Sequence, residues 1–376
     1  MVIRYYAKCT TCGEHYTIRY SVGNGFPQSA SFFCLNCGEK LVMGFKNQDE
    51  SIFENLVQTK REGKIVNLHP EALIDPKFQQ SDFHFASIDL MRNPVFGFEN
   101  IDKLKLIQVS ILKYEQQWEM ISKDYRLLKE NRWNLLTSKY GADQTKTKNK
   151  ILKQVIAAGW LFIDGEWTKI YNNVAGELLL AKQKTGFVAF KTYIESKAGE
   201  ILIDKMFSIM SEYYNVRTEL LVTLIAQKAG IKIEGFSSSV NWEKIEMVYG
   251  NFYELYGDLL FIPSGINNII QRNDYSLFLT PGFSFSNYLQ SDKAGRCTNF
   301  ITNANLKALS DYYEASIRNG THHKTSKIDK TTQEIILATG KAGQTQKTIP
   351  FVDYIAACNE VYARSLVLFI IATKII

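Results

Sequence analysis

The chain has 376 residues, of which 45% are hydrophobic and 13% aromatic, enough for two or three globular domains with cores of their own. A formal net charge of +6 is mildly basic and favours a partner that carries phosphate. Six cysteines are too few for a disulfide framework, so a reducing compartment is expected. The most apolar stretch, residues 366–372, is shorter than the ~20 residues that span a bilayer, and no hydrophobic leader follows Met1. We therefore expect a cytoplasmic protein without membrane contact.

Two Cys-x-x-Cys pairs near the N-terminus carry the clearest motif of the chain. Their residues are Cys9, Cys12, Cys34 and Cys37. Each pair is followed by a glycine, Gly13 or Gly38, which permits the tight turn of a metal knuckle. Residues 2–6 and 16–20 have strand character, and the segment 23–25 predicts a hairpin tip. Four thiolates at this spacing form a closed tetrahedral Zn²⁺ site, which is structural because no coordination position remains for water or substrate.

This N-terminal pattern resembles the zinc ribbon, a small β module with one metal knuckle at each of two hairpins. The resemblance covers residues 1–45, and the zinc is expected to stabilise a core too small to fold alone. The partner of the ribbon stays open among a nucleic acid, another protein and a downstream domain of the same chain.

A second region, residues 46–185, is predicted to combine a connector with a helical hairpin. Three prolines between residues 46 and 100 indicate irregular structure there. An apolar seam from Leu104 to Leu128 then follows alternating steps of three and four residues, which predicts a long helix. A polar stretch, residues 138–150, predicts a turn before a second helix that begins near Ile151. Lysines at positions 146, 148, 150 and 153 fit either a solvated loop or a nucleic-acid contact.

The third region, residues 186–376, is predicted to be an antiparallel helical bundle, so the fold class is mainly α. Periodic apolar residues predict helices over residues 191–214, 217–229, 242–259, 305–317 and 352–372. Two short segments, 334–337 and 348–351, predict a small β-hairpin inserted in the bundle.

One motif in this third region points to an activity. The chain reads Arg318-Asn319-Gly320-Thr321-His322-His323. An Arg-Asn, three residues and a His between two helices of a bundle resembles the signature of the HEPN superfamily, whose catalytic members are metal-independent ribonucleases. The resemblance spans residues 190–376 and assigns the catalytic roles to Arg318, Asn319 and His323, with His322 as an auxiliary neighbour. It also implies a homodimer with the site between two copies.

The chemistry implied by this resemblance is RNA cleavage through the 2′-hydroxyl of the substrate. His323 would exchange a proton, Arg318 would hold the scissile phosphate, and Asn319 would orient either group. Gly320 is expected to let the chain leave helical geometry so that Arg318 and His323 converge. By analogy the protein would be a toxin or an antiphage defence effector, restrained by a regulatory protein or a nucleic-acid trigger.

A second interpretation removes catalysis altogether. The chain would then be a nucleic-acid-binding or regulatory scaffold that uses the zinc ribbon and a dimeric helical bundle. A zinc-dependent enzyme is disfavoured because four thiolates leave no open position on the metal.

Overall fold

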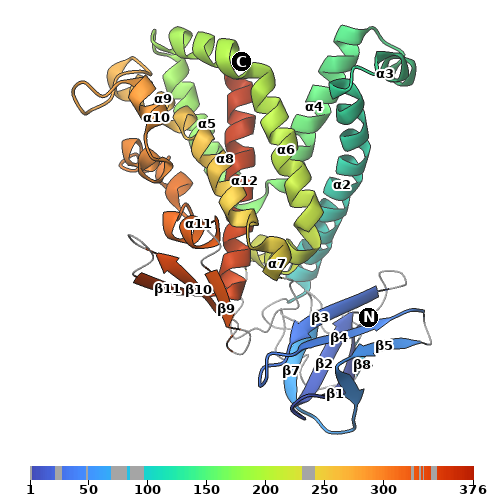
Figure 1. Cartoon of the computed structure of the whole chain (residues 1–376). Helices are drawn as coiled ribbons and strands as arrows, with labels where there is room; N and C mark the ends of the chain where they lie inside the picture. The colour runs from blue at the N-terminus through green and yellow to red at the C-terminus, as the bar shows by residue number, and fades with distance from the viewer. Residues whose placement is uncertain are drawn as a thin grey trace. The chain divides into compact units, whose positions relative to one another are not determined.

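The computed structural model describes most of the chain, coloured from the N-terminus to the C-terminus in Figure 1. The described residues are 2–21, 28–47, 50–68, 83–84, 97–230, 242–322, 326–329, 332, 334–339 and 345–376. They fall into two compact units. One unit comprises residues 1–108, 217–247 and 319–357, and the other comprises residues 109–216, 248–318 and 358–376.

The N-terminal part of the first unit is a strand module with two sheets. Its strands are β1 (Val2–Cys9), β2 (His15–Ser21), β3 (Gln28–Phe33), β4 (Lys40–Phe45), β5 (Ser51–Glu54), β6 (Leu56–Gln58), β7 (Lys64–Leu68) and β8 (Phe83–His84). The first sheet has the order β6-β1-β2-β7, with β8 paired to β1, and the second has the order β3-β4-β5. Neighbours are antiparallel except β2 and β7, which are parallel.

Alternating apolar residues build the core of this strand module. Tyr16 and Ile18 of β2 are fully buried, together with Phe32 of β3 and Met43 of β4. The predicted strands over residues 2–6 and 16–20 are confirmed, whereas the predicted tip at 23–25 lies outside the described residues. Segment 51–68, expected to be irregular, forms β5, β6 and β7 instead. These strands are short, and their apolar residues gain a core only by pairing with β1, β2 and β4.

Helices dominate the rest of the chain. They are α2 (Gly97–Lys129), α3 (Trp133–Tyr140), α4 (Gln144–Phe162), α5 (Gly165–Lys182), α6 (Phe187–Ala229), α7 (Trp242–Ile245), α8 (Val248–Leu259), α9 (Phe261–Arg272), α10 (Phe285–Gln290), α11 (Ala315–His322) and α12 (Phe351–Ile375), with short 3₁₀ turns η3 (Lys293–Asn299) and η4 (Lys307–Ser310). The mainly helical class is therefore confirmed, as are the long helix of the apolar seam and the final helix.

An aromatic cluster forms the centre of the second unit, which we call the helical unit. Phe162 of α4 contacts the rings of Tyr114, Trp167, Tyr213 and Tyr362, which come from α2, α5, α6 and α12, at centroid distances of 4.8–5.6 Å. The Tyr213 and Tyr362 rings stack at 3.9 Å. Their hydroxyls are satisfied inside the core, since Tyr362 shares a 2.7 Å hydrogen bond with Tyr114 and Tyr213 donates to Asn359 over 2.8 Å. The apolar seam of α2 thus packs against α4 and α12 through Tyr114 and against α6 through Trp118.

Four segments differ from the sequence-based prediction. The helices predicted over residues 191–214 and 217–229 are one helix, α6, and the helix predicted over residues 242–259 is divided into α7 and α8. The stretch 138–150 is not one turn, because α3 continues to Tyr140 and α4 begins at Gln144, where the carboxylate of Asp143 accepts the Lys146 amide over 2.9 Å. The predicted helix over 305–317 is wrong. Tyr312 has a positive φ of 62° that separates η4 from α11, and the Tyr249 hydroxyl fixes this bend by donating to the Tyr312 carbonyl over 2.6 Å.

The predicted hairpin is confirmed and is one strand larger than expected. Strand β10 (Glu334–Thr339) pairs antiparallel with β11 (Thr345–Pro350), and β9 (Ser326–Asp329) adds to the other edge of β10. After the hairpin, α12 is long and apolar enough to cross a membrane by length and composition, which residues 366–372 alone did not indicate. In the most apolar part of this helix, 89% of the residues are buried inside the protein. Packing in the core therefore accounts for the apolar sequence of α12.

Candidate metal centre and the surroundings of Arg318

Two similar turns carry the four cysteines. In the first, the Cys9 amide donates to the Glu14 carbonyl over 2.9 Å and the Gly13 amide donates back to the Cys9 carbonyl over 2.9 Å. In the second, Cys34 and Gly38 repeat both bonds at 2.8 and 2.9 Å. Gly13 and Gly38 have φ angles of +77° and +73°, a conformation that glycine adopts without strain. The glycine after each pair is therefore required by the backbone, as the sequence predicted.

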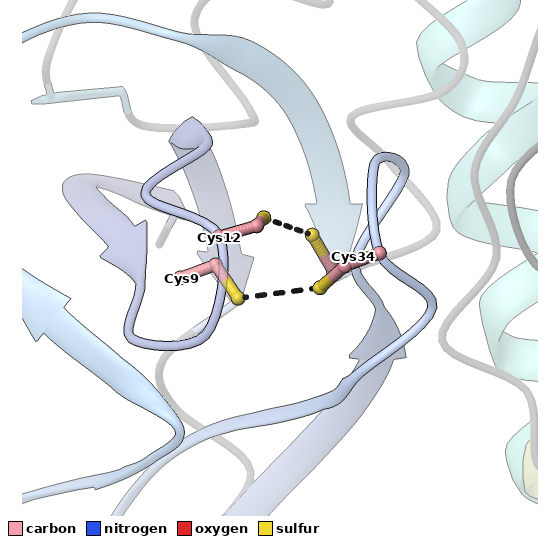
Figure 2. A group of neighbouring side chains, drawn as sticks. Cys9, Cys12 and Cys34 are labelled. Atoms are coloured by element: carbon pink, nitrogen blue, oxygen red, sulfur yellow. Dashed lines mark hydrogen bonds between the residues drawn. The ribbon is translucent and has the colours of Figure 1, made fainter.

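The two turns bring all four sulfurs together (Figure 2). Their Sγ atoms lie within 4.8 Å of one another, with Cys9 and Cys37 at 3.8 Å and Cys12 and Cys34 at 3.5 Å. Four sulfurs at about 2.3 Å from a central zinc ion would be about 3.8 Å apart. Small shifts of the side chains would therefore complete a tetrahedral site, so the predicted ligand set is compatible with a bound metal.

A buried hydroxyl supports one of the sulfurs. Tyr16 Oη lies 3.0 Å from Cys34 Sγ and accepts the Leu35 amide over 2.7 Å. Because the Tyr16 oxygen already accepts a hydrogen bond from this amide, the hydroxyl proton of Tyr16 can point at the Cys34 sulfur. Burial by itself would raise the pKa of Cys34, but hydrogen bonds from Tyr16 and from the amides of Cys37 and Asn36 lower it to about 7. These donors favour the thiolate, the form that binds metal.

The two remaining cysteines lie outside this cluster. Cys297 and Cys358 are buried in the helical unit, and burial raises the pKa of Cys297 to about 12. A thiol in such surroundings is protonated at neutral pH and behaves as a small apolar side chain.

Arg318, the predicted catalytic arginine, forms an ion pair with a carboxylate. Its Nε and Nη2 atoms both lie 2.6 Å from Oε1 of Glu254 on α8. The other oxygen of Glu254 accepts the Lys293 ammonium over 2.8 Å, and this ammonium also lies 2.8 Å from Asp258, one turn further along α8. About a quarter of the Arg318 side chain is exposed. The guanidinium is therefore held in a fixed direction at the surface of the helical unit.

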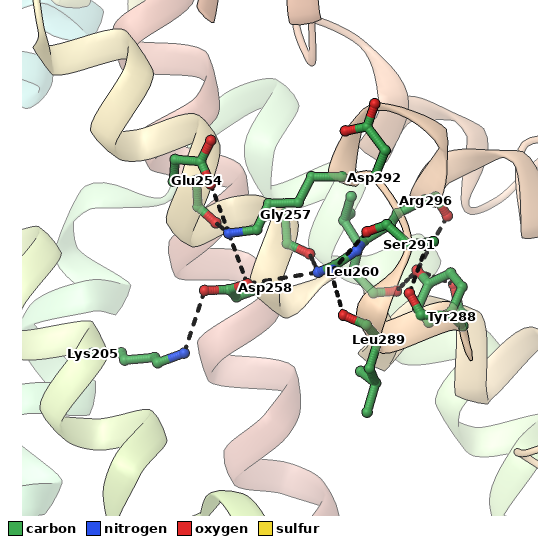
Figure 3. A network of polar contacts seen from close by, with 12 residues as sticks. Lys205, Glu254, Gly257, Asp258, Leu260, Tyr288, Leu289, Ser291, Asp292 and Arg296 are labelled. Atoms are coloured by element: carbon green, nitrogen blue, oxygen red, sulfur yellow. Dashed lines mark hydrogen bonds and ion pairs between the residues drawn. The ribbon is translucent and has the colours of Figure 1, made fainter. Parts of the chain in front are cut away.

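The network continues from Asp258 into the interior, where Figure 3 shows Lys205 on one side of this carboxylate and Arg296 on the other. The Arg296 side chain is only 6% exposed and donates to the carbonyls of Gly257, Leu289 and Ser291 over 2.8, 2.6 and 3.3 Å. A buried arginine with this many carbonyl acceptors ties η3, on which it lies, to α8 and to the C-terminal end of α10. This part of the network has a structural role.

The ammonium group of Lys293 and the guanidinium group of Arg318 lower the pKa of Glu254. Its partial burial would raise the pKa, but Lys293 and Arg318 lower it below the ordinary value of 4.5. The carboxylate is thus charged at neutral pH and keeps both cations in place. No feature of the sequence marked Glu254 or Lys293, because they lie 64 and 25 residues before Arg318 and only the fold joins them.

The other residues of the motif are placed only in part. Asn319 is exposed and Arg318 partly buried, and both belong to the helix α11, which extends through position 322. Gly320 does not bend the chain, contrary to the prediction, because it is helical and buried against β10. A Cβ at Gly320 would lie 2.8 Å from Leu337 Cδ2 and 2.9 Å from Leu337 Cβ, so close packing explains the glycine. The His322 side chain and all of His323 lie outside the described residues, so their convergence with Arg318 stays a prediction.

Comparisons with protein-family models, curated proteins and solved structures found no match for this chain.

Proposed function

We propose that the four cysteines bind one Zn²⁺ ion and that the chain is a metal-stabilised nucleic-acid-binding protein. The observation that supports this most strongly is the set of four sulfurs within 4.8 Å of one another, presented by two matching turns. A centre with four thiolate ligands has no open position for substrate, so its role is to fold the strand module for recognition. The net charge of +6 favours a polyanionic partner.

Metal content tests the first half of this proposal. Purified protein should retain one zinc ion per chain by elemental analysis, and Cys34→Ser should lose it. Cys297→Ser is the matched control, because it removes a buried thiol outside the cluster. Zinc retained by Cys34→Ser as well as by the parent would contradict the assignment of the ligands.

Salt-dependent binding tests the second half. We expect the full chain to bind a labelled single-stranded RNA of about 20 nucleotides in fluorescence anisotropy, with an affinity that falls as salt rises, because phosphate contacts release counterions. An affinity too weak to detect at low salt would contradict nucleic-acid binding while leaving the metal assignment intact.

We also propose a second function, metal-independent RNA cleavage by a HEPN-like helical bundle. The observation that favours it is the fixed orientation of the Arg318 guanidinium, which Glu254 holds through two nitrogens while part of the side chain stays exposed. A guanidinium aimed by a carboxylate is arranged in advance to meet a phosphodiester. His323 would supply the proton transfer, Asn319 would orient the substrate, and two copies would form the active dimer.

Cleavage in the presence of a chelator tests this second function. The parent should convert labelled structured RNA to products with 2′,3′-cyclic phosphate ends, and both Arg318→Ala and His323→Ala should not. Arg272→Ala is a matched control, because Arg272-Asn273 repeats the dipeptide without a histidine after it. Equal cleavage by the parent and by Arg318→Ala would overturn the assignment.

A further inference from the structure

Helix α4 presents a stripe of positive charge to solvent. Lys146, Lys150 and Lys153 are exposed and are spaced by four and three residues, which places them on one face of the helix. The opposite face is buried through Thr147, Ile151, Val155 and Ala158. Seven residues at 1.5 Å each extend over about 10 Å, so the three ammonium groups form a row along the helix.

This stripe is not neutralised by its own helix. Residues 144–162 contain four lysines and no aspartate or glutamate. The N-cap Asp143 is paired with the stripe, 3.2 Å from the Lys146 ammonium. Among the described residues, Lys150 and Lys153 have no carboxylate within ion-pair distance. Lys146 lies in the first turn of α4, where a positive charge acts against the helix dipole at a cost of about 0.3–1 kcal/mol.

The neighbouring helix α3 places an aromatic ring, Tyr140, beside the stripe. The Lys150 ammonium lies 5.9 Å from the centroid of the Tyr140 ring, and the Lys139 ammonium lies 5.6 Å from the same centroid. Tyr140 is held in place because its hydroxyl contacts Asp124 and Gln154 over 2.5 and 3.0 Å. The buried Asp124 pairs with Lys139 and neutralises that one charge. One aromatic ring thus gathers ammonium groups from two helices.

We propose that this lysine stripe, Lys146, Lys150 and Lys153, is the surface that contacts the phosphate backbone of a nucleic acid. The proposal rests on the nucleic-acid binding proposed above and names the contacting residues. A row of lysines about 10 Å long matches a strand that carries regularly spaced phosphates, and lysine recognises phosphate as a point charge without reading the base sequence.

The test compares two triple variants with the same net charge. Lys146→Gln/Lys150→Gln/Lys153→Gln removes the stripe, whereas Lys169→Gln/Lys184→Gln/Lys307→Gln removes three exposed lysines elsewhere in the helical unit. Binding of labelled single-stranded RNA is measured from low to high salt. We expect the stripe variant to bind roughly tenfold or more weakly near 100 mM salt and to lose about two to three from the slope of log affinity against log salt. The control variant should stay within about twofold of the parent.

Thermal melting of both variants separates loss of contact from loss of fold. The stripe variant should melt within a few degrees of the parent, since all three side chains are exposed and surface substitutions change stability little. Lys146→Arg/Lys150→Arg/Lys153→Arg should bind RNA as the parent does. Equal weakening in the two triple variants, or a parent that binds anionic lipid vesicles or poly-glutamate as tightly as RNA, would overturn the proposal. If the stripe variant binds RNA as tightly as the parent, the assignment of the contact to these three lysines is wrong. If the parent itself binds no RNA, the proposed nucleic-acid binding is wrong as a whole.

Discussion

The strand module and the helical unit are stabilised by different means. The strand module has a small core of short strands, and its two cysteine turns meet at a cluster of sulfurs. The helical unit has a large aromatic centre around Phe162. The comparison indicates that metal removal and core truncation should act on separate regions, the first on the strands and the second on the helices.

Removal of the metal should have the largest effect. Chelation or Cys34→Ser should unfold the strand module, because a structural zinc site contributes apparent binding energy on the order of 10 kcal/mol. Hydrogen exchange followed by mass spectrometry should show loss of protection in β1–β4 and unchanged protection in α5 and α9. Equal loss of protection in strands and helices would show that the two regions do not respond separately.

Truncation of Phe162 should destabilise the helical unit. Phe162→Ala leaves a cavity among Tyr114, Tyr213 and Tyr362, and deletions of this size cost about 3–5 kcal/mol. Denaturant unfolding followed by far-ultraviolet circular dichroism measures the effect. Leu179→Ala is the control, because the Leu179 side chain is 63% exposed and its truncation should change stability by about 0.5 kcal/mol or less. Zinc content should be the same in both variants.

Loss of the Tyr16 hydroxyl should have a smaller effect, confined to the metal centre. Tyr16→Phe leaves the Leu35 amide without its acceptor and removes the donor to Cys34, a change worth about 1–3 kcal/mol. Competition with a chromophoric chelator should show weaker zinc retention. Tyr20→Phe is the control, because it removes a hydroxyl from the same strand at a position away from the sulfurs. A similar weakening of zinc retention in Tyr20→Phe would contradict the role of the Tyr16 hydrogen bond.

The smallest expected effect is the pH response of Glu254. Its pKa is lower in the folded chain, so its charged form contributes stability that is complete above the ordinary value of 4.5 and is lost as pH falls through the lower folded value. Glu254→Gln should therefore melt at a lower temperature than the parent at pH 6, and the difference should shrink toward pH 3. A difference that stays constant over this range would mean that charge is not the cause.

Local patterns predicted the regular elements, and the fold decided the remainder. Cysteine spacing with a following glycine was sufficient to predict that the four thiols meet in a cluster that could hold a metal, because each turn is a local structure. The seam of α2 could be predicted from periodicity, although its partners could not. The bend at Tyr312 depends on a hydroxyl 63 residues away, and Gly320 is explained by its approach to Leu337. A local sequence pattern contains no information about such contacts, and for that reason the prediction of one helix over residues 305–317 was wrong.

The unequal exposure of the four cysteines has a consequence for oxidative damage. Cys9 and Cys34 are buried, whereas Cys12 and Cys37 are exposed at the tips of their turns. A peroxide arriving from solvent would therefore reach Cys12 or Cys37 first. Each turn thus exposes one sulfur to oxidants and keeps the other inside, so loss of the metal under oxidative stress would begin at the outer pair.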